Sequence, residues 1–437
     1  MNLTVTLEHR FARTLDGRVW TRTTFAHRFW ERYLEVFESV RVVARAWEAR
    51  DLSGDWKRVD GDLVSFVGVP FYVGPWRYLL NRGKVVSAMK SAVHLEDAVI
   101  MRVPSQLATV LMPQLRRNRH PYGLEVVGDP YDVFGPGAVR HPIRPFFRWW
   151  FSQQLRWQCA HAIAGAYVTE YALQRRYPLD AGCLSFYYSN VEITDSSFSP
   201  NDRSLISSFH YSDIDISQTL YAGGSRHGSR NRETFKLVTV GSLEQLYKGT
   251  DILIDAVARC VKDGFDLKLF IVGGGKHKSE LEARAMAKGL GDRAFFLGEL
   301  SAGDAVRQRL DEADLFILPS RTEGMPRAMI EAMARGLPCI GTAVGGIPEL
   351  LPSEDMVPPN DAPALAKKIR EVLAEPERMI QMSRRNLAKV EEFREENLRR
   401  RRVQFYSYIK NMTEEWQKAG VHPCLWADHV RGIGHKF

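Results

Sequence analysis

Two glutamates, Glu323 and Glu331, stand eight residues apart within the segment 320–351. A turn that follows an apolar strand is expected to hold Glu323, and the helix after that turn is expected to hold Glu331. Carboxylates near the end of a strand can accept hydrogen bonds from hydroxyl groups, such as those of a sugar or a ribose. The types and spacing of these residues therefore favour a site for a hydroxylated ligand.

The same region has features that suit a phosphate group. Pro326 is predicted at the first position of the helix, and the free N–H groups of such a helix start can bind a phosphate with the help of the helix dipole. Gly324 has no side chain to block a ligand, and Gly345 with Gly346 forms a second glycine turn. Lys248 stands at another predicted helix start, where a cation is unfavourable unless an anion binds there.

Three further motifs have simpler interpretations. Asp213 and Asp215 have the spacing of a metal-binding DxD motif, but they lie in a Ser-rich segment, so we expect a solvated loop and no bound metal. The three glycines at 273–275 lack the spacing of a dinucleotide fingerprint, which favours a tight turn. Asp129 is open to two interpretations, a loop cap or a functional carboxylate.

The second half of the chain alternates short apolar runs with helical patterns. Strands are predicted at 235–242, 267–275, 294–298, 314–320 and 338–342, with helices at 248–264, 279–291, 304–313 and 326–336. This alternation is typical of βαβ units with a parallel sheet covered on both faces. Ligands of such doubly wound sheets bind beyond the carboxyl ends of the strands.

The first half is less regular, but it also predicts an α/β domain. Strands are expected at 62–71, 97–105, 122–130 and 162–169, and a helix at 146–161. We divide the chain into an N-terminal α/β domain (1–195), a linker rich in Ser, Asp, Gly and Arg (196–234), a second α/β domain (235–395) and C-terminal helices that pack back on the first domain (396–437).

Composition limits the class of protein. The chain has 437 residues, a formal net charge of +8 and a pI of about 9.2, which favours two domains and an anionic partner. Its five cysteines form no CxxC pair, so neither a disulfide framework nor a zinc site is expected. No signal peptide and no run of 18 apolar residues is visible, and we expect a cytoplasmic protein that can rest on the inner face of a membrane.

Residues 140–157 interleave arginines with phenylalanines and tryptophans. Such a segment can lie in the interface of an anionic membrane, with aromatic rings at headgroup depth and arginines on phosphates. It can equally be a core helix whose aromatics pack against the N-terminal sheet. No RNA- or DNA-binding motif accompanies it, so no nucleic-acid partner is expected.

The glutamate motif has a wider resemblance. It reads Glu323-Gly324-x-Pro326 followed by Glu331-Ala332-Met333-Ala334-x-Gly336-x-Pro338. This pattern resembles the E-x7-E signature of glycosyltransferase family 4, a retaining group with the GT-B fold, and the following GGIPEL turn is typical of it. The run Val240-Gly241-Ser242-Leu243 with Lys248-Gly249 resembles the first strand, loop and helix of the family's donor domain. Ser189-Asn190-Val191-Glu192, with Phe198 and Pro200, resembles the segment that closes its N-terminal domain.

The resemblance implies a role for each matching residue. Glu331 would bind the ribose of a nucleotide, Glu323 would lie against the donor sugar, and Lys248 would neutralise the diphosphate. The implied donor-binding set is Gly241, Ser242, Lys248, Gly298, Glu323, Gly324, Met325, Pro326, Arg327 and Glu331. The sequence departs from the family at two places, because Ser242 stands where an arginine is common and Asp129 falls near the place of a histidine. Lys248, Glu323 and Asp129 are therefore the catalytic candidates.

The resemblance also implies an overall fold and an activity. The fold would be two Rossmann-like domains facing a cleft, an acceptor-side domain (1–195) and a nucleotide-sugar-binding domain (235–395). The activity would be a retaining, metal-independent hexosyl transfer without a cofactor, from a nucleotide diphosphate-sugar to a hydroxyl of a glycan or lipid-linked acceptor. Cell-envelope or exopolysaccharide biosynthesis is the expected setting. A nucleotide-sugar epimerase of the GT-B fold and a non-catalytic nucleotide-sugar-binding module are the alternatives.

Overall fold

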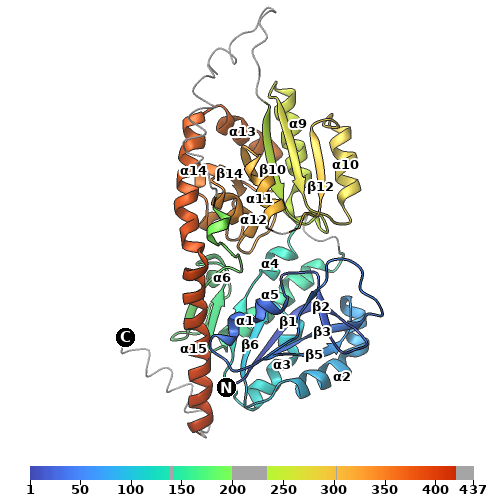
Figure 1. The fold of residues 1–437 in the computed structure, drawn as a ribbon, viewed down its shortest axis with the longest axis vertical. Coiled ribbons are helices and arrows are strands. Elements are labelled where there is room, and N and C mark those ends of the chain that lie inside the picture. Colours follow the sequence, from blue (N-terminus) through green and yellow to red (C-terminus); the bar gives the residue numbers. More distant parts are fainter. Residues whose placement is uncertain (137–140, 199–233, 302, 420–437) are drawn as a thin grey trace, which may run out of the picture. The chain divides into compact units, whose positions relative to one another are not determined.

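The structure is a computed structural model that describes residues 1–136, 141–198, 234–301 and 303–419 (Figure 1). The chain forms two compact units. The N-terminal unit consists of Met1–Pro130, Trp149–Tyr188 and the residues from Leu398 onward, and the C-terminal unit consists of Tyr131–Arg148 and Ser189–Asn397. Within the described residues, no helix combines the length and the apolar character needed to cross a bilayer.

A mostly parallel sheet forms the centre of the N-terminal unit. Its parallel strands follow the order β5-β3-β1-β6-β7-β8-β9, and two short strands, β2 and β4, extend it in antiparallel pairing beside β1. The strands are β1 (Leu3–Arg13), β2 (Val19–Thr21), β3 (Val40–Glu48), β4 (Lys57–Arg58), β5 (Val64–Pro70), β6 (Ala98–Val103), β7 (Gly123–Val126), β8 (Ala164–Tyr167) and β9 (Leu184–Tyr187). The strands predicted near 62–71, 97–105, 122–130 and 162–169 are confirmed as β5 to β8.

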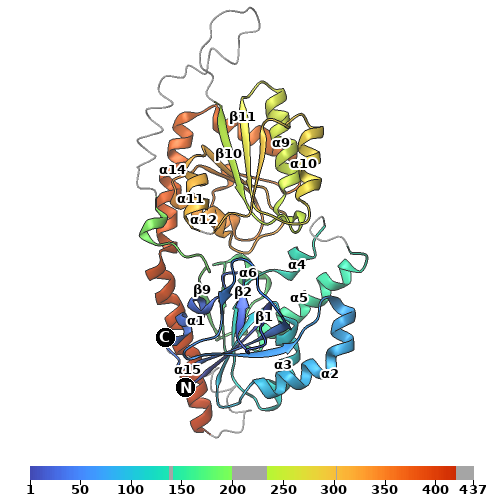
Figure 2. The same cartoon turned by 45° about the vertical axis from the view of Figure 1, so that its right-hand side comes forward.

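Helices cover both faces of this sheet. One face carries α2 (Gly74–Ala92), α3 (Gln106–Arg117) and α5 (Arg144–Ala160), and the other carries α1 (His27–Leu34) and α15 (Glu395–Ala419) (Figure 2). Two short helices, α4 (Pro130–Val133) and α6 (Ala172–Arg176), follow β7 and β8. The last helix fits closely, because a Cβ at Gly123 of β7 would lie only 2.7 Å from Cδ1 of Ile409.

Helix α5 contains most of residues 140–157, for which the sequence predicted either a membrane-interface segment or a core helix. Its buried residues are Ser152, Leu155, Gln158 and Cys159, which face the unit's core, whereas Phe146, Trp149 and Trp150 are exposed. The interpretation that the aromatics of this segment all pack against the sheet is therefore wrong for these three rings. The helix is anchored by one side and presents aromatic rings on another.

A buried carboxylate connects α1 and α15 to the middle of the N-terminal sheet. Glu125 of β7 forms an ion pair with Arg102 of β6. It also accepts hydrogen bonds from the hydroxyls of Tyr33 (3.0 Å) on α1, Tyr188 (2.7 Å) and Tyr406 (3.2 Å) on α15. Every one of these side chains is buried. Since a buried charge is tolerated only when it is paired and hydrogen-bonded, this network fixes where α1 and α15 lie on the sheet.

The C-terminal unit has a fully parallel sheet in the order β12-β11-β10-β13-β14-β15. Its strands are β10 (Phe235–Val240), β11 (Leu267–Val272), β12 (Ala294–Gly298), β13 (Leu315–Leu318), β14 (Cys339–Thr342) and β15 (Met356–Val357). Its helices are α9 (Thr250–Lys262), α10 (Lys278–Ala287), α11 (Asp304–Asp311), α12 (Arg327–Ala334), α13 (Ala362–Leu373) and α14 (Pro376–Val390). Counted from β10, the order is that of a Rossmann fold, which reverses between the first strand and the fourth.

The sequence-based strands and helices of this unit are confirmed, with one correction. Pro326 is not the first residue of α12, because the helix begins at Arg327 and Pro326 is its N-cap residue, with φ −77° and ψ 98°. Proline suits this extended conformation, and its carbonyl accepts hydrogen bonds from the N–H groups of Met329 (3.1 Å) and Ile330 (3.2 Å). The start of α12 is therefore shifted by one residue.

We predict that Glu125→Gln destabilises the N-terminal unit by about 3–5 kcal/mol, because the buried Arg102 would lose its counter-charge. Thermal and urea unfolding of the full chain measure this loss. The matched control is Glu96→Gln, since the Glu96 side chain is 83% exposed, and it should change stability by less than about 0.5 kcal/mol. Equal unfolding midpoints for both variants would contradict a stabilising role of the network.

Candidate active site

The reversal in strand order brings two predicted site residues into contact. Lys248 follows β10 and Glu323 follows β13, and these strands are neighbours in the sheet. The Nζ of Lys248 lies 2.6 Å from Oε1 of Glu323, and the hydroxyl of Ser320 donates to the same oxygen at 2.6 Å. Glu323 is only 8% exposed and Ser320 is fully buried. The cation and the carboxylate that the motif predicted therefore form a largely buried ion pair at the carboxyl ends of the strands.

Two glycines allow the loops around this pair to pass very close to each other. Gly249, directly after Lys248, has φ +70°, and a Cβ there would lie 2.0 Å from the carbonyl oxygen of Pro319. Gly345 has φ +53°, and its Cβ would lie 1.9 Å from the carbonyl oxygen of Glu323. Any side chain would push these segments apart, so the three loops after β10, β13 and β14 can meet only with glycine at these positions.

Arg321 locks the loop after β10 to the loop after β13. Its guanidinium makes two hydrogen bonds of 2.8 Å to the carboxylate of Asp251 in the first turn of α9, and it donates to the carbonyl of Leu246. Its backbone N–H donates to the carbonyl of Tyr247 at 2.7 Å. The residues on both sides of Lys248 are therefore held by Arg321, two residues before Glu323. Sequence reasoning missed this role, because an arginine in a turn gives no sign of which acid it will meet.

Glu331 lies on α12 and differs from Glu323 in its surroundings. Among the described residues, no side chain donates a hydrogen bond to its carboxylate. Burial raises the pKa of this carboxyl above its usual value, and the positive charges of Arg327 and Arg307 oppose the rise only in part. A partly buried carboxylate without a donor is poised to accept hydrogen bonds from a ligand.

The remaining residues of the predicted donor set lie on the same loops. Gly241 and Ser242 follow β10 directly, and Gly298 ends β12, where its carbonyl accepts from the N–H of Gly273 at 2.8 Å. Gly324 and Met325 lead into α12. Because Pro326 is the N-cap residue, the N–H groups of Arg327 and Ala328 have no acceptor within the helix. All of these predicted residues therefore belong to the C-terminal unit and to its strand ends.

Asp129 belongs to the N-terminal unit, and its carboxylate is already engaged. The hydroxyl of Tyr177 donates to Oδ1 at 2.6 Å, and Arg176 forms an ion pair with Oδ2. Both partners lie at the end of α6, so the aspartate holds that helix end against the loop after β7. A direct part in chemistry stays a prediction.

Of the glycine run and the DxD motif, the structure describes only the glycine run. The glycine run 273–275 forms a tight crossing, because Gly273 and Gly275 have φ values of +139° and +147°. Asp213, Asp215 and Pro200 lie outside the described residues. Within the described ranges, no group of three or more histidine, cysteine, aspartate or glutamate side chains is arranged to hold a metal ion.

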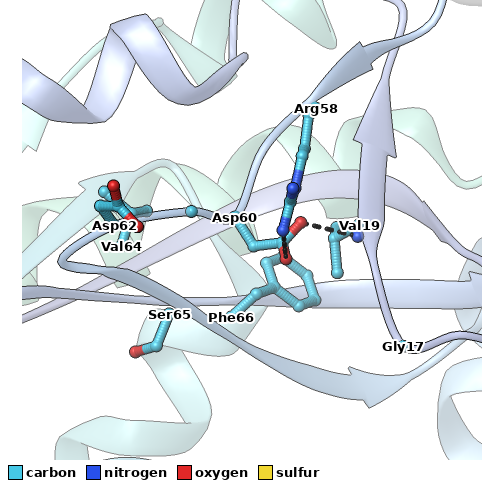
Figure 3. Close-up of a pocket in the computed structure, with 9 residues that line it drawn as sticks. Gly17, Val19, Arg58, Asp60, Asp62, Val64, Ser65 and Phe66 are labelled. Carbon is cyan, nitrogen blue, oxygen red and sulfur yellow. Dashed lines mark hydrogen bonds and ion pairs between the residues drawn. The ribbon is translucent and has the colours of Figure 1, made fainter.

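Among the cavities of the described residues, two lie away from the Lys248–Glu323 pair. One, of about 380 Å³, is in the N-terminal unit beside β2 and β4, where Asp60 accepts from the N–H of Val19 at 2.8 Å and pairs with Arg58 at 3.3 Å (Figure 3). The other, of about 450 Å³, is in the C-terminal unit between α11 and the segment 195–198. Its wall includes Arg335, which pairs with Asp311 at 2.6 Å and donates to the carbonyl of Phe198 at 2.5 Å. Neither cavity is lined by a residue of the predicted donor set.

The geometry of the C-terminal unit agrees with a family comparison. Residues 234–375 match the family model described as glycosyl transferases group 1, and this range includes Lys248, Glu323 and Glu331. The chain carries a group 1 glycosyltransferase domain. A match to the model of this domain extends over the whole C-terminal sheet and over the turns that hold the ion pair.

Similar proteins extend the comparison to the rest of the chain. It is 26% identical over 404 residues to Protein CapJ of Staphylococcus aureus, covering 90% of this chain and 89% of that protein. It is 34% identical over 143 residues to the putative colanic acid biosynthesis glycosyltransferase WcaL of Escherichia coli (strain K12), covering 31% of this chain and 35% of WcaL. The match to CapJ therefore spans both units, whereas the match to WcaL spans about a third of either chain.

A solved structure confirms the fold class. Sucrose-phosphate synthase from Thermosynechococcus elongatus aligns with a TM-score of 0.68 at 18% identity, covering 94% of this chain and 100% of that one. At this identity the likeness concerns the fold alone. Both units are Rossmann-like and the fold is GT-B, as the sequence resemblance implied.

The raised pKa of Glu331 predicts how its removal changes stability. The unfolded chain ionises this carboxyl at a lower pH than the folded chain does, so above the folded pKa the charge destabilises the fold. Glu331→Gln should therefore raise the melting temperature at neutral pH, and the gain should shrink as pH falls toward about 4.5, the ordinary value. Scanning calorimetry from neutral to acidic pH measures this. The control is exposed Glu354→Gln, and a Glu331 variant that melts lower than wild type at neutral pH would contradict the analysis.

Arg321 and Asp251 should be energetically coupled. We predict a coupling free energy of about 0.5–3 kcal/mol from a double-mutant cycle of Arg321→Ala and Asp251→Ala, because both side chains are largely buried and bidentate. The comparison is a cycle on Arg293 and Asp266, a partly exposed pair expected to give about 0.2–1 kcal/mol. An Arg321–Asp251 coupling free energy no larger than that of Arg293–Asp266 would contradict the role of Arg321 in joining the loops after β10 and β13.

Proposed function

We propose that this group 1 glycosyltransferase is a retaining, metal-independent hexosyltransferase. It would move a sugar from a nucleotide diphosphate-sugar to a hydroxyl of a glycan or lipid-linked acceptor. The observation that carries the proposal is the Lys248–Glu323 ion pair at the point where the strand order reverses. A cation and a carboxylate fixed at this place supply the two charges that a sugar diphosphate needs, one for phosphate and one for hydroxyls.

Glu323 has one oxygen left for a ligand. Its Oε1 is occupied by Lys248 and Ser320, while no described residue donates to its Oε2. The carboxylate is thus oriented by two donors and keeps lone pairs on its second oxygen for a sugar hydroxyl. Because the two donors hold the group before a ligand arrives, little reorganisation is needed on binding.

Lys248 would carry the electrostatic part of the reaction. As the bond between sugar and diphosphate breaks, negative charge gathers on the leaving oxygen, and a fixed cation in a partly buried site stabilises that charge strongly. The N–H groups of Arg327 and Ala328 at the start of α12 can add partial positive charge. In a retaining mechanism of this kind, the leaving diphosphate takes the proton of the incoming hydroxyl, so the protein needs no separate base.

Glu331 would bind the ribose of the donor. Its carboxylate lacks a donor among the described residues, and two vicinal hydroxyls could satisfy it. Binding of hydroxyl donors would also compensate the desolvation that raises the pKa of this group. The charged form of Glu331, which is unfavourable without a ligand, would therefore be stabilised by a bound nucleotide.

The setting we propose is cell-envelope or exopolysaccharide biosynthesis on the cytoplasmic side of the membrane. Support for the setting comes from WcaL, whose name refers to colanic acid biosynthesis and which is 34% identical over 143 residues of this chain. Support for a reducing compartment comes from Cys159, Cys183, Cys260 and Cys339, all of which are free thiols.

The decisive experiment compares Lys248→Ala with wild type in chelator. We predict that wild-type transfer persists in excess EDTA, whereas Lys248→Ala loses about a hundredfold in turnover, the scale of one transition-state donor. Lys367→Ala is the matched control, because Lys367 is an exposed lysine of the same unit. The product's anomeric configuration, measured by NMR, should equal that of the donor.

Four results would overturn parts of this proposal. Loss of wild-type activity in EDTA with recovery in magnesium or manganese would replace the metal-free account. Inversion of the anomeric centre would exclude the retaining mechanism. Donor turnover that is independent of any acceptor would favour an epimerase, and binding of donor without any turnover would favour a binding module.

A further inference from the structure

The first half of α2 is not buried in the core, although the ring of Tyr78 packs against a buried residue there, Tyr72, at 5.3 Å between ring centres. Its buried residues are Val85, Met89 and Ala92, all in its second half, and no side chain from 74 to 84 is buried. This exposed half contains large apolar residues, because Trp76 is 77% exposed and Leu80 is 86% exposed, with Leu79 also exposed. Three large apolar side chains within five residues of one exposed helix form a contiguous patch, which on a protein surface marks an interaction site.

Basic residues surround this patch, and acidic residues are absent from its helices. Over α2, α3 and residues 149–160 of α5 the chain has seven lysines and arginines and no aspartate or glutamate. All seven are exposed: Arg77, Arg82, Lys84, Lys90, Arg116, Arg117 and Arg156. The whole chain has 60 basic and 52 acidic residues, so a surface with basic residues alone departs clearly from the average.

The three helices form one continuous layer on the sheet of the N-terminal unit. Helix α3 lies between the other two, because Gln114 of α3 donates to the carbonyl of Lys90 on α2 at 3.3 Å, while the guanidinium of Arg116 lies 5.1 Å from the ring centre of Trp157 on α5 (Figure 2). The exposed Trp149 and Trp150 stand on the same layer. We call this layer, from α2 across α3 to residues 149–160 of α5, the basic–aromatic face.

An anionic lipid bilayer fits the chemistry of this face. Tryptophan prefers the headgroup region, leucine enters the acyl boundary, and lysine and arginine are attracted to anionic lipid phosphates. A second copy of the chain fits poorly, because a symmetric contact would place seven positive charges against seven others. A nucleic acid would be attracted to the charges but would leave Leu79 and Leu80 in water.

We propose that the basic–aromatic face docks the protein on an anionic lipid bilayer, with the first half of α2 as its main anchor. Helix α2 lies at the surface, so its apolar residues can enter a membrane without any change in the core. The proposal does not rest on the proposed function, because binding to lipid requires neither donor nor acceptor. A glycosyltransferase attached in this way would meet acceptors that are themselves anchored in the membrane.

The test measures binding of the full chain to lipid vesicles by flotation. Phosphatidylcholine vesicles with phosphatidylglycerol should bind the protein, and vesicles of phosphatidylcholine alone should bind it at least about tenfold more weakly. Trp76→Ser with Leu80→Ser should reduce binding to the anionic vesicles by roughly tenfold or more, and so should Arg77→Glu with Arg82→Glu.

A matched control distinguishes loss of vesicle binding at the basic–aromatic face from the general effect of removing an exposed leucine. Leu15 is 85% exposed, as Leu80 is, but it lies in the turn between β1 and β2, so Leu15→Ser should leave vesicle binding unchanged. Because the altered residues are exposed, all variants should melt as wild type does, which keeps a folding defect from imitating the result. Each variant is therefore compared at equal stability.

Three outcomes would overturn the proposal. Equal vesicle binding by the Leu15→Ser protein and the protein with Trp76→Ser and Leu80→Ser would remove α2 as the anchor. Equal binding to neutral and anionic vesicles would remove the basic residues from the interaction. A wild-type dimer that dissociates on Leu80→Ser, seen by analytical ultracentrifugation, would assign the patch to a contact between copies of the chain.

Discussion

The contact between Lys248 and Glu323 depends on the order of the strands in the C-terminal sheet. The chain leaves β10, builds β11 and β12 on one side, and returns to build β13 on the other. At this reversal, the loops after β10 and β13 leave the sheet side by side without a helix between them. Two side chains that are 75 residues apart in sequence can therefore form an ion pair. Gly249 and Gly345 then allow the loops to pass close to each other, and the hydrogen bonds of Arg321 hold them together.

The two units use buried carboxylates in opposite ways. Glu125 has its acceptor sites filled by an arginine and three tyrosines, so its charge fixes helices on a sheet. Glu331 has none of its sites filled by the described residues, and burial raises its pKa. The satisfied charge of Glu125 stabilises the fold, whereas Glu331 keeps acceptor sites that the ribose of the proposed donor could fill.

The sequence predicted the C-terminal sheet well, because its strands are continuous apolar runs that alternate with helices. It predicted the N-terminal sheet less fully. Strand β1 was missed because Thr4 and Thr6 interrupt its apolar pattern, although both are buried and Thr4 donates to Asp97 at 3.1 Å. The partner of Thr4 is 93 residues away in sequence, and a local pattern cannot show it. The same limit applies to Arg321, whose partner Asp251 lies 70 residues away.

The packing of Ile409 and Tyr406 of α15 against β7 has a consequence for how the chain folds as it is translated. The N-terminal sheet is made early, but one of its faces is covered by a helix that emerges only after the complete C-terminal unit. All strands of the C-terminal sheet lie between Phe235 and Val357, so this sheet can close before α15 is translated. Glu125 must wait for Tyr406 until α15 has left the exit tunnel. The N-terminal unit is therefore completed only after the strands of the C-terminal unit have been translated, although its own strands are translated first.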